Sequence, residues 1–260
     1  MSQPKGYVDS GYLQAAARLL LPAKQRSYAF MQIRPGYGVL DVGSGPGTDT
    51  VALGQIVGST GRVWGVDNDA AMVGEADQRA ENSGVSAWVK HQQADATALP
   101  WEANEFDACR SERLFQHLAS PEQALAEMAR VTKPGGWVVV LDTDWGTLST
   151  DTEETDIERR LARVCVERCL QNGYSGRQLY RLFRRRNLED ITIEMIPAIV
   201  TSYALARLIA IFDRVEKEAL AAGILTEHEL ERWHSSLARA DREGFFFNSC
   251  SMVLVGGRKT

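Results

Sequence analysis

Three glycines and two acidic residues stand together in VLDVGSGPGTDT, residues 39–50. Gly43, Gly45 and Gly47 occupy every second position, which lets the chain turn sharply and lets its backbone approach a ligand closely. The GxGxG spacing differs from the GxGxxG spacing that is typical of dinucleotide sites. Asp41 precedes the first glycine by two residues, where a carboxylate is poorly placed for a diphosphate and well placed for an ammonium group. We therefore expect a ligand with a positively charged amine at this turn.

Two further acidic residues follow neighbouring predicted strands. Asp67 ends the run RVWGVD, where its carboxylate can accept two hydrogen bonds from ribose hydroxyls, and Asn68 comes next. Asp95 and Ala96 lie in QADATALPW and are expected to flank an adenine ring with its exocyclic amine. Ribose, adenine and an amino acid together describe S-adenosylmethionine. The alternative for Asp67 is a helix N-cap, and the alternative for the glycines is a tight turn without a ligand.

The elements that must position these residues alternate between strands and helices. Short apolar runs suited to buried strands are predicted at 38–42, 62–66, 87–92, 106–110 and 137–141, and helices between them at 48–57, 69–83, 112–118 and 121–132. This alternation predicts a parallel sheet covered on both faces, with the ligand at the carboxyl ends of its strands.

The regular alternation ends after residue 142. Helices are predicted at 151–172, 176–187, 203–222 and 226–243, a strand at 190–196 closed by Pro197, and a final strand at 248–255. Before the glycine turn, residues 11–33 are predicted to be helical and interrupted at Pro22.

The segments VLDVGSGPG, VDND, ADATALPW, FDACRSERLFQHL and RVTKPGGWVVVLD cover about residues 35–145. In their order and spacing they resemble the class I S-adenosylmethionine-dependent methyltransferases, in particular the small-molecule group that includes the ubiquinone and menaquinone C-methyltransferases. The resemblance implies a Rossmann-like sheet of seven mostly parallel strands, the last antiparallel, with helices on both faces. We expect residues 1–34 to form a helical lid and residues 35–260 the core, with helical cap insertions at about 146–175 and 200–245.

The resemblance also implies which residues hold the cofactor. They fall into four groups: Asp41, Gly43, Ser44 and Gly45 at the methionine end, with Ser111 beside it; Asp67 and Asn68 at the ribose; Asp95 and Ala96 at the adenine; and Tyr12 in the N-terminal segment.

Methyl transfer from a sulfonium is an in-line displacement, in which positioning alone can supply about 7–11 kcal/mol of the barrier. His117 is the candidate general base, and Arg113, expected one turn earlier on the same helix, would favour the neutral imidazole. Asp144 lies at the expected mouth of the fifth strand, where it could accept a proton or orient a hydroxyl group of the acceptor.

Aromatic and cationic residues complete the expected acceptor pocket. Tyr7, Tyr12 and Trp145 are candidate aromatic walls for the positive sulfur, and Arg113 is assigned to the same pocket. Two carboxylates near the fifth strand are too generic in spacing to predict a Mg²⁺ site, so no metal is expected.

Composition limits the alternatives. The net charge of −5 argues against a protein that coats nucleic acid, and the four cysteines form no CxxC pair, as expected for reduced thiols. No apolar run reaches the roughly 20 residues of a membrane span, so a soluble, cytoplasmic protein is expected. We expect a small, apolar or aromatic acceptor. An RNA or protein methyltransferase and a non-catalytic cofactor-binding subunit remain as alternatives, and the methylated atom and the oligomeric state are not evident.

Overall fold

The computed structural model describes the backbone of residues 10–260 and the side chains of residues 19–260. Within this range seven strands form one sheet in the order β3-β2-β1-β4-β5-β7-β6. Strands β1 to β5 are parallel, and β7 lies between β5 and β6, antiparallel to both. The expected fold class is confirmed. The strands are β1 (Gly38–Val42), β2 (Arg62–Asp67), β3 (Val89–Gln93), β4 (Phe106–Glu112), β5 (Thr132–Thr150), β6 (Glu189–Val200) and β7 (Asn248–Arg258).

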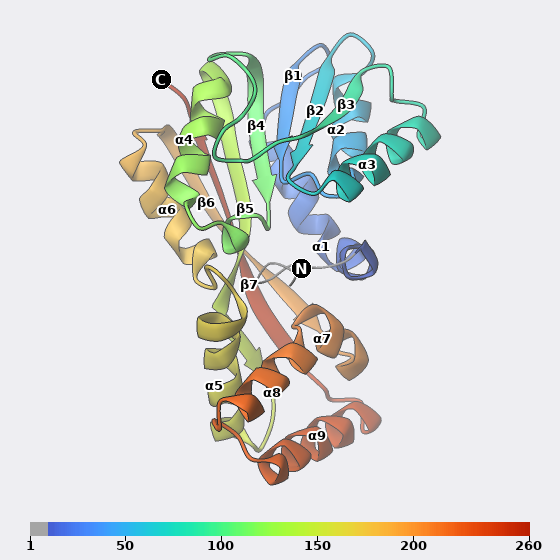
Figure 1. The fold of residues 1–260 in the computed structure, drawn as a ribbon, viewed down its shortest axis with the longest axis vertical. Coiled ribbons are helices and arrows are strands. Elements are labelled where there is room, and N and C mark those ends of the chain that lie inside the picture. Colours follow the sequence, from blue (N-terminus) through green and yellow to red (C-terminus); the bar gives the residue numbers. More distant parts are fainter. Residues whose placement is uncertain (1–9) are drawn as a thin grey trace.

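Helices cover both faces of the sheet (Figure 1). Val39 of β1 packs in one apolar cluster with Leu20 and Leu53, while its neighbour Leu40 packs in another with Leu125 and Leu179. Because both faces are buried, the strand is apolar at consecutive positions and not at alternate ones. The helices that supply these residues are α1 (Ser10–Phe30), α2 (Thr48–Val57), α4 (Pro121–Val131) and α6 (Ser175–Arg185), and α3 (Ala70–Asn82) contributes Ala80 to the cluster of Val39.

Helix α1 continues through Pro22, so the predicted interruption is wrong. Its buried residues Leu20, Ala23 and Ser27 recur at helical spacing and, with Met31 just after the helix, face the sheet. This packing compensates for the backbone hydrogen bond that proline removes, which is how tertiary contacts override a local propensity. The described part of the expected lid is therefore integrated into the core.

The last three strands are longer than predicted and carry a second lobe. Figure 1 shows β5, β6 and β7 running past the parallel core into the lower half of the molecule, where α5, α7, α8 and α9 surround them. The cap is thus built on the extended sheet. The lobe contains α5 (Thr155–Val164), a π-helical turn (Cys165–Cys169), α7 (Tyr203–Ile209), α8 (Phe212–Ala221) and α9 (Glu227–Arg242).

Four further predictions of this region are wrong in extent. The helix expected at 151–172 changes to a π-helical turn at Cys165, and the helix expected at 203–222 breaks at Ile211, which has a left-handed φ of 50°. Strand β6 continues beyond Pro197, which an edge strand tolerates. The strand predicted to end at residue 255 extends to Arg258.

An irregularity in strand β5 occurs where the two lobes meet. Asp144 pairs with Ser251 and the next pair is Ser149 with Ser249, so residues 145–148 face Cys250 alone. A bulge of this kind redirects side chains out of the regular pleat. The bulge presents Trp145 and Leu148 to the space between the lobes. Separately, no helix among the described residues has the length and hydropathy of a membrane span.

Candidate cofactor and acceptor site

The glycine turn is fastened to strand β2. The amides of Gly43 and Ser44 both donate to the carbonyl of Val66, at 2.8 and 2.9 Å. The amide of Gly45 donates to Oδ2 of Asp67 at 2.9 Å. All three glycines of the turn have left-handed φ values, as a turn between β1 and α2 at this spacing requires. The turn therefore lies at the carboxyl ends of β1 and β2, as predicted.

The third glycine of the turn, Gly47, is required for a reason that does not involve a ligand. A Cβ atom on Gly47 would lie 2.8 Å from Cβ and 2.9 Å from Cα of Ala76 in helix α3. Any other residue would force α2 and α3 apart. The sequence analysis expected the glycines to let the backbone approach a ligand. At Gly47 the close approach is instead between helices α2 and α3.

Asp67 keeps capacity for a ligand. Its two oxygens accept from the amides of Gly45 and Asp69, and each can still accept a further hydrogen bond. The N-cap of α3 is Asp69, whose carboxylate accepts from the amide of Ala71 at 2.8 Å. The N-cap alternative for Asp67 is therefore wrong. Asn68 is exposed beside it.

Asp95 lies after the neighbouring strand β3. Both of its hydrogen bonds, from the amide and the hydroxyl of Thr97, end on Oδ1 at 2.7 Å. They fix the carboxylate at the surface with Oδ2 available to an amine, and they lower the pKa of Asp95. Ala96 is buried in the core next to it. The order of the strands thus places the glycine turn, Asp67 and Asp95 in succession along one edge, which fits an elongated nucleoside ligand.

Asp41 faces the protein interior. Its carboxylate is paired with the fully buried guanidinium of Arg110 at 3.2 Å, and only 3% of the Asp41 side chain is exposed. Burial raises the pKa of Asp41 to about 7, although the charge of Arg110 opposes the shift. Direct contact with a cofactor amine stays a prediction, and it requires Arg110 to release this carboxylate.

Arg110 belongs to a buried ionic cluster that the sequence analysis missed. Lys24 of α1 donates to Asp49 at 2.5 Å and to Glu112 at 2.7 Å, and Arg110 also bonds Glu112 at 2.9 Å. Tyr28 donates its hydroxyl to Asp49. The one available signal was an arginine inside the predicted strand at 106–110. A cation in a buried strand needs acidic partners, but the sequence does not identify them.

The two serines assigned to the cofactor are buried. The hydroxyl of Ser111 donates to the carbonyl of Val42 at 2.8 Å, which joins β4 to β1 and leaves the residue inside the strand, not after it. The hydroxyl of Ser44 is enclosed without a hydrogen-bond partner among the described residues. Such an orphaned buried group at the glycine turn is consistent with a missing polar ligand.

Arg113 and His117 do not share a helix, so that prediction is wrong. Arg113 has a left-handed φ of 50°, and only residues Phe115–His117 form a single 3₁₀ turn. The amide of Arg113 donates to the carbonyl of Leu141 at 2.8 Å, which fixes the residue at the end of β4. Its guanidinium donates to Glu112 at 3.1 Å.

A chain of hydrogen bonds determines the tautomer of His117. The indole of Trp145 can only donate, and it donates to Oε1 of Gln116 at 2.5 Å. The amide nitrogen of Gln116 must therefore be the donor to Nε2 of His117 at 3.1 Å. Nδ1 then carries the proton, and it is buried without a partner among the described residues. Gln116 was not anticipated, because glutamine has no distinctive spacing signal.

His117 is neutral in this arrangement. Burial lowers its pKa to about 4, and the charges of Arg113 and Arg214 add to the shift. The imidazole therefore has the charge state expected of a general base. The lone pair of its unprotonated nitrogen is, however, already engaged by Gln116. The base function stays a prediction, and it requires that bond to break.

Both carboxylate oxygens of Asp144 accept hydrogen bonds from the protein. Its Oδ2 accepts from Nε of Arg177 at 2.7 Å and its Oδ1 from the amide of Gly146 at 3.2 Å. Because β5 continues to Thr150, Asp144 lies within the strand and not at its mouth, which corrects the predicted position. Asp142 accepts from the amides of Thr143 and Gln116, and burial raises its pKa to about 7. No group of three or more metal-binding side chains occurs among the described residues.

A mostly apolar hollow lies between the two lobes, next to Arg113. Its volume is about 50 Å³. Among the described residues that line it, Arg113 is the only charged one, and Trp145 forms part of its wall. That this hollow is the acceptor pocket expected from the sequence stays a prediction. The other residues that line it are Leu19, Leu20, Thr143, Leu148, Ala198, Val200, Ile209, Ala210, Asn248, Cys250 and Met252.

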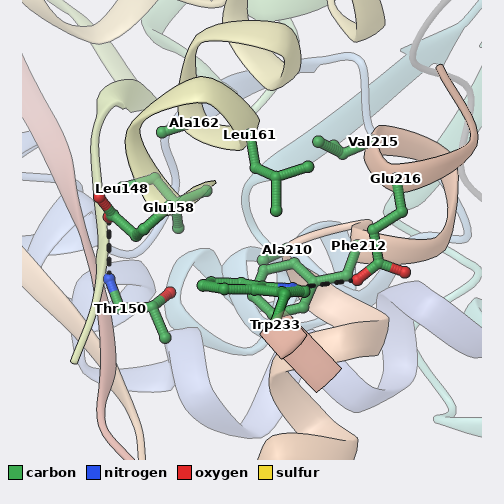
Figure 2. A pocket seen from close by; sticks show the side chains of 10 residues that line it. All are labelled: Leu148, Thr150, Glu158, Leu161, Ala162, Ala210, Phe212, Val215, Glu216 and Trp233. Carbon is green, nitrogen blue, oxygen red and sulfur yellow. Dashed lines mark hydrogen bonds between the residues drawn. The ribbon is translucent and has the colours of Figure 1, made fainter. Parts of the chain in front are cut away.

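A second, smaller pocket of about 20 Å³ lies deeper in the lower lobe. Figure 2 shows the flat indole of Trp233 across its floor, with the indole nitrogen directed at Glu216, and Glu158 on the opposite side bound to the amide of Thr150. The carboxylates of Glu216 and Glu158 therefore both accept hydrogen bonds from groups within the lower lobe. Leu148 and Ala210 line this pocket and the hollow, so the two spaces are neighbours.

Two of the predicted aromatic walls cannot be placed. Tyr7 lies outside the described residues, and Tyr12 lies in helix α1 at a position whose side chain is not described.

The comparisons with known proteins agree with this geometry. Residues 40–140 match the methyltransferase-domain family. An uncharacterized 37.1 kDa protein in transposon TN4556 of Streptomyces fradiae is 34% identical over 230 residues, which are 88% of this chain and 65% of that protein. The ubiquinone/menaquinone biosynthesis C-methyltransferase UbiE of Klebsiella pneumoniae is 36% identical over 110 residues, which are 42% of this chain and 44% of UbiE. The chain thus spans less than two thirds of either relative.

Solved structures share the fold. YcgJ of Bacillus subtilis superimposes with a TM-score of 0.64 at 21% identity, over 93% of this chain and 98% of that one. The geranyl diphosphate C-methyltransferase of Streptomyces coelicolor A3(2) gives 0.59 at 17% identity, over 98% of this chain and 86% of that one. At such identities the likeness concerns the fold alone. Residues 40–140 thus match a methyltransferase domain, and the fold and the order of the motifs are those of class I S-adenosylmethionine-dependent methyltransferases.

Proposed function

We propose that the protein transfers a methyl group from S-adenosylmethionine to a small, apolar or aromatic acceptor. The observation that carries this proposal is the hollow between the lobes, which is small, mostly apolar among the described residues and adjacent to the carboxyl end of β4. An RNA or protein substrate would need an open groove at this place. The hollow holds only a few water molecules, so we expect α1 and α7, which line it, to move apart when an acceptor enters.

Asp67, Asp95 and the glycine turn would hold the cofactor, which supplies a methyl group on a positively charged sulfur. Asp67 would accept hydrogen bonds from the ribose, and Asp95 from the adenine amine. Both carboxylates have acceptor capacity, and both are fixed by backbone amides, so little ordering is needed on binding. Such preorganisation reduces the cost of binding.

The residues around the hollow would align the acceptor and exclude water. Trp145 is held by Gln116 and forms a rigid wall. His117 is neutral and buried nearby, and we propose that it contacts the acceptor either as a base, after losing the bond to Gln116, or as an N–H donor through Nδ1. For a methyl donor that is already activated, alignment and desolvation are the main requirements.

The experiment that tests the proposal uses S-adenosylmethionine labelled with a CD₃ group. The purified full chain is incubated with it and a small-metabolite extract of the source organism, and labelled products are sought by mass spectrometry. A labelled small molecule supports the proposal and identifies the acceptor. Label in RNA or protein would instead support a macromolecular substrate, and binding of the cofactor without any labelled product would support a non-catalytic subunit.

A further inference from the structure

Two neighbouring spaces run from the end of β4 into the lower lobe. The first is the hollow, which Arg113 lines at the end of β4. The second is the pocket of about 20 Å³ above Trp233, which we name the inner pocket. Of the described residues, Leu148 and Ala210 alone line both spaces. These two side chains therefore form the boundary between the spaces, and a shift of either one would join them into one cavity.

The inner pocket favours an apolar group over water. Apart from Thr150, Glu158 and Glu216, the described residues that line it have apolar or aromatic side chains. Glu216 accepts hydrogen bonds from Arg207 and from the indole of Trp233. Glu158 accepts one from the amide of Thr150. A buried water molecule typically makes about three hydrogen bonds to groups that otherwise lack partners, whereas an apolar cavity stays empty and can take an apolar ligand.

The far wall of the inner pocket is held in place by a hydrogen-bond network. The indole of Trp233, which lies across the floor in Figure 2, is 2% exposed and donates to Oε1 of Glu216 at 3.2 Å. Both oxygens of Glu216 also accept from the guanidinium of Arg207, at 3.1 and 2.9 Å. Because this wall is fixed, an adjustment to the length of a ligand must take place at Leu148 and Ala210.

Both boundary residues lie where the backbone departs from regular structure. Leu148 is the last residue of the bulge in β5. Ala210 lies between α7 and α8 together with Ile211, whose left-handed φ of 50° is uncommon for a β-branched residue. A bulge redirects side chains, and a strained backbone persists only where the surrounding structure imposes it. Two separate irregularities thus converge on the boundary between the hollow and the inner pocket.

From these observations we propose that the acceptor is elongated, with an apolar chain that passes Leu148 and Ala210 and ends against Trp233. The small volume of the inner pocket suits an unbranched chain. The end of the acceptor that receives the methyl group stays in the hollow, beside the end of β4. Leu148 and Ala210 then determine how long an acceptor the protein takes. This inference rests on the proposed function, because it names the class of acceptor for the same site.

The test compares three probes that differ only in chain length: 1-hexanol, 1-octanol and 1-decanol. Their dissociation constants for the full chain are measured by calorimetry. Burial of one methylene group is worth about 0.8 kcal/mol, which corresponds to about fourfold in affinity. We expect the wild type to bind 1-decanol at least about tenfold more tightly than 1-hexanol, because at least two of the four added methylene groups enter the inner pocket.

Two variants at the boundary should change this ratio of affinities in opposite directions. Leu148→Ala widens the passage and should raise the ratio by at least about fourfold, equivalent to one more buried methylene group. Ala210→Leu narrows the passage and should lower the ratio by at least about as much. Ala210→Val is the smaller substitution to use if the leucine variant does not fold. A general loss of stability cannot produce two opposite shifts.

The matched control is Leu237→Ala. Leu237 is fully buried in the same apolar cluster as Leu148 and Ala210, and it lines neither space. The variant removes the same atoms as Leu148→Ala, so it should lose stability and leave the ratio of affinities unchanged.

Four results would overturn the inference: equal affinity of the wild type for 1-hexanol and 1-decanol, an unchanged ratio in both boundary variants, the same shift in Leu237→Ala as in Leu148→Ala, or binding of none of the alcohols. The experiment with CD₃-labelled S-adenosylmethionine tests the proposed function separately. A compact labelled product without an apolar chain would leave the proposed function standing and refute the elongated acceptor. The expected dependence on chain length, without any labelled product, would support the joined cavity and contradict the proposed function.

Discussion

Replacing Arg110 by methionine tests whether the cluster below the glycine turn is a buried ionic network. Arg110 is fully buried and lies 3.2 Å from Asp41, 2.9 Å from Glu112 and 3.5 Å from Asp49. Two of these contacts are charge-assisted hydrogen bonds, each worth about 1.5–3 kcal/mol. Removing one partner of a buried pair costs about 3–5 kcal/mol, because the other charge stays buried. Methionine fills most of the volume, so a cavity adds little. We expect the free energy of unfolding to fall by about 3–5 kcal/mol.

The loss of stability in Arg110→Met should be larger at high pH than at low pH. Without Arg110 the pKa of Asp41 rises further above its value of about 7, so the native variant retains a proton that the wild type releases. The variant is then penalised more at pH 8 than at pH 5.5. Urea unfolding at both pH values measures this difference. Asp41→Asn on the Arg110→Met background should restore part of the stability, since the asparagine carries no charge.

Two outcomes would refute the reasoning. One is a loss below about 1 kcal/mol in Arg110→Met, which is the typical net contribution of a single neutral hydrogen bond. The other is a double-mutant cycle in which Asp41→Asn and Arg110→Met are additive, since residues that share a buried network must couple. The exposed pair of Arg26 and Glu194 supplies the control, because removing Arg26 should cost less than about 1 kcal/mol.

Three more predictions concern single sites. Asp67→Ala should weaken S-adenosylmethionine binding by at least about 1.5 kcal/mol in calorimetry. Asp69→Ala should leave this affinity unchanged and lower only the stability of the protein. Equal effects of the two variants on the affinity would contradict the assignment of Asp67 to the ribose. Gly47→Ala should lower the melting temperature more than Gly223→Ala. Both glycines have left-handed φ values, but a Cβ atom would have neighbours within 4 Å only at Gly47. Equal decreases in melting temperature would show that backbone strain alone accounts for the effect. Between about pH 4 and 7 the contribution of Asp142 to stability should fall, because native Asp142 titrates near 7 and unfolded Asp142 near 3.8, so the folded state binds more protons in this window. Thermal unfolding of Asp142→Asn should show a flatter pH dependence there, and an unchanged slope would exclude this carboxyl.

The parallel half of the fold was predictable because its signals are local. Strand β1 and helix α2 match the predicted ranges 38–42 and 48–57, since buried parallel strands are apolar at consecutive positions and the glycine turn separates them. The extended halves of β5 and β6 were not, because the first mixes polar residues with Gly146 and the second begins at Pro197. Their strand conformation follows from pairing with β7.

The same distinction applies to the candidate site. The positions of Asp67 and Asp95 follow from the ends of their strands and needed no tertiary knowledge. The bond from Lys24 to Glu112 joins residues 88 positions apart, and no periodicity in the sequence relates them. Arg113 lines the hollow, and its assignment to the acceptor pocket stays a prediction. Its left-handed conformation was missed, because arginine has no preference for that region.

The bulge at residues 145–148 has a mechanical consequence. Because three hydrogen-bonded strands carry the lower lobe, the lobe cannot swing on a flexible linker, and any hinge would have to break backbone bonds between strands. A ribbon of strands yields most easily by twisting where its ladder is interrupted, and the ladder between β5 and β7 is interrupted opposite Cys250. Trp145, Leu148 and Cys250 all line the hollow at this point. Torsion of the ribbon should therefore change the width of the hollow, and a ligand that fills the hollow should resist this torsion.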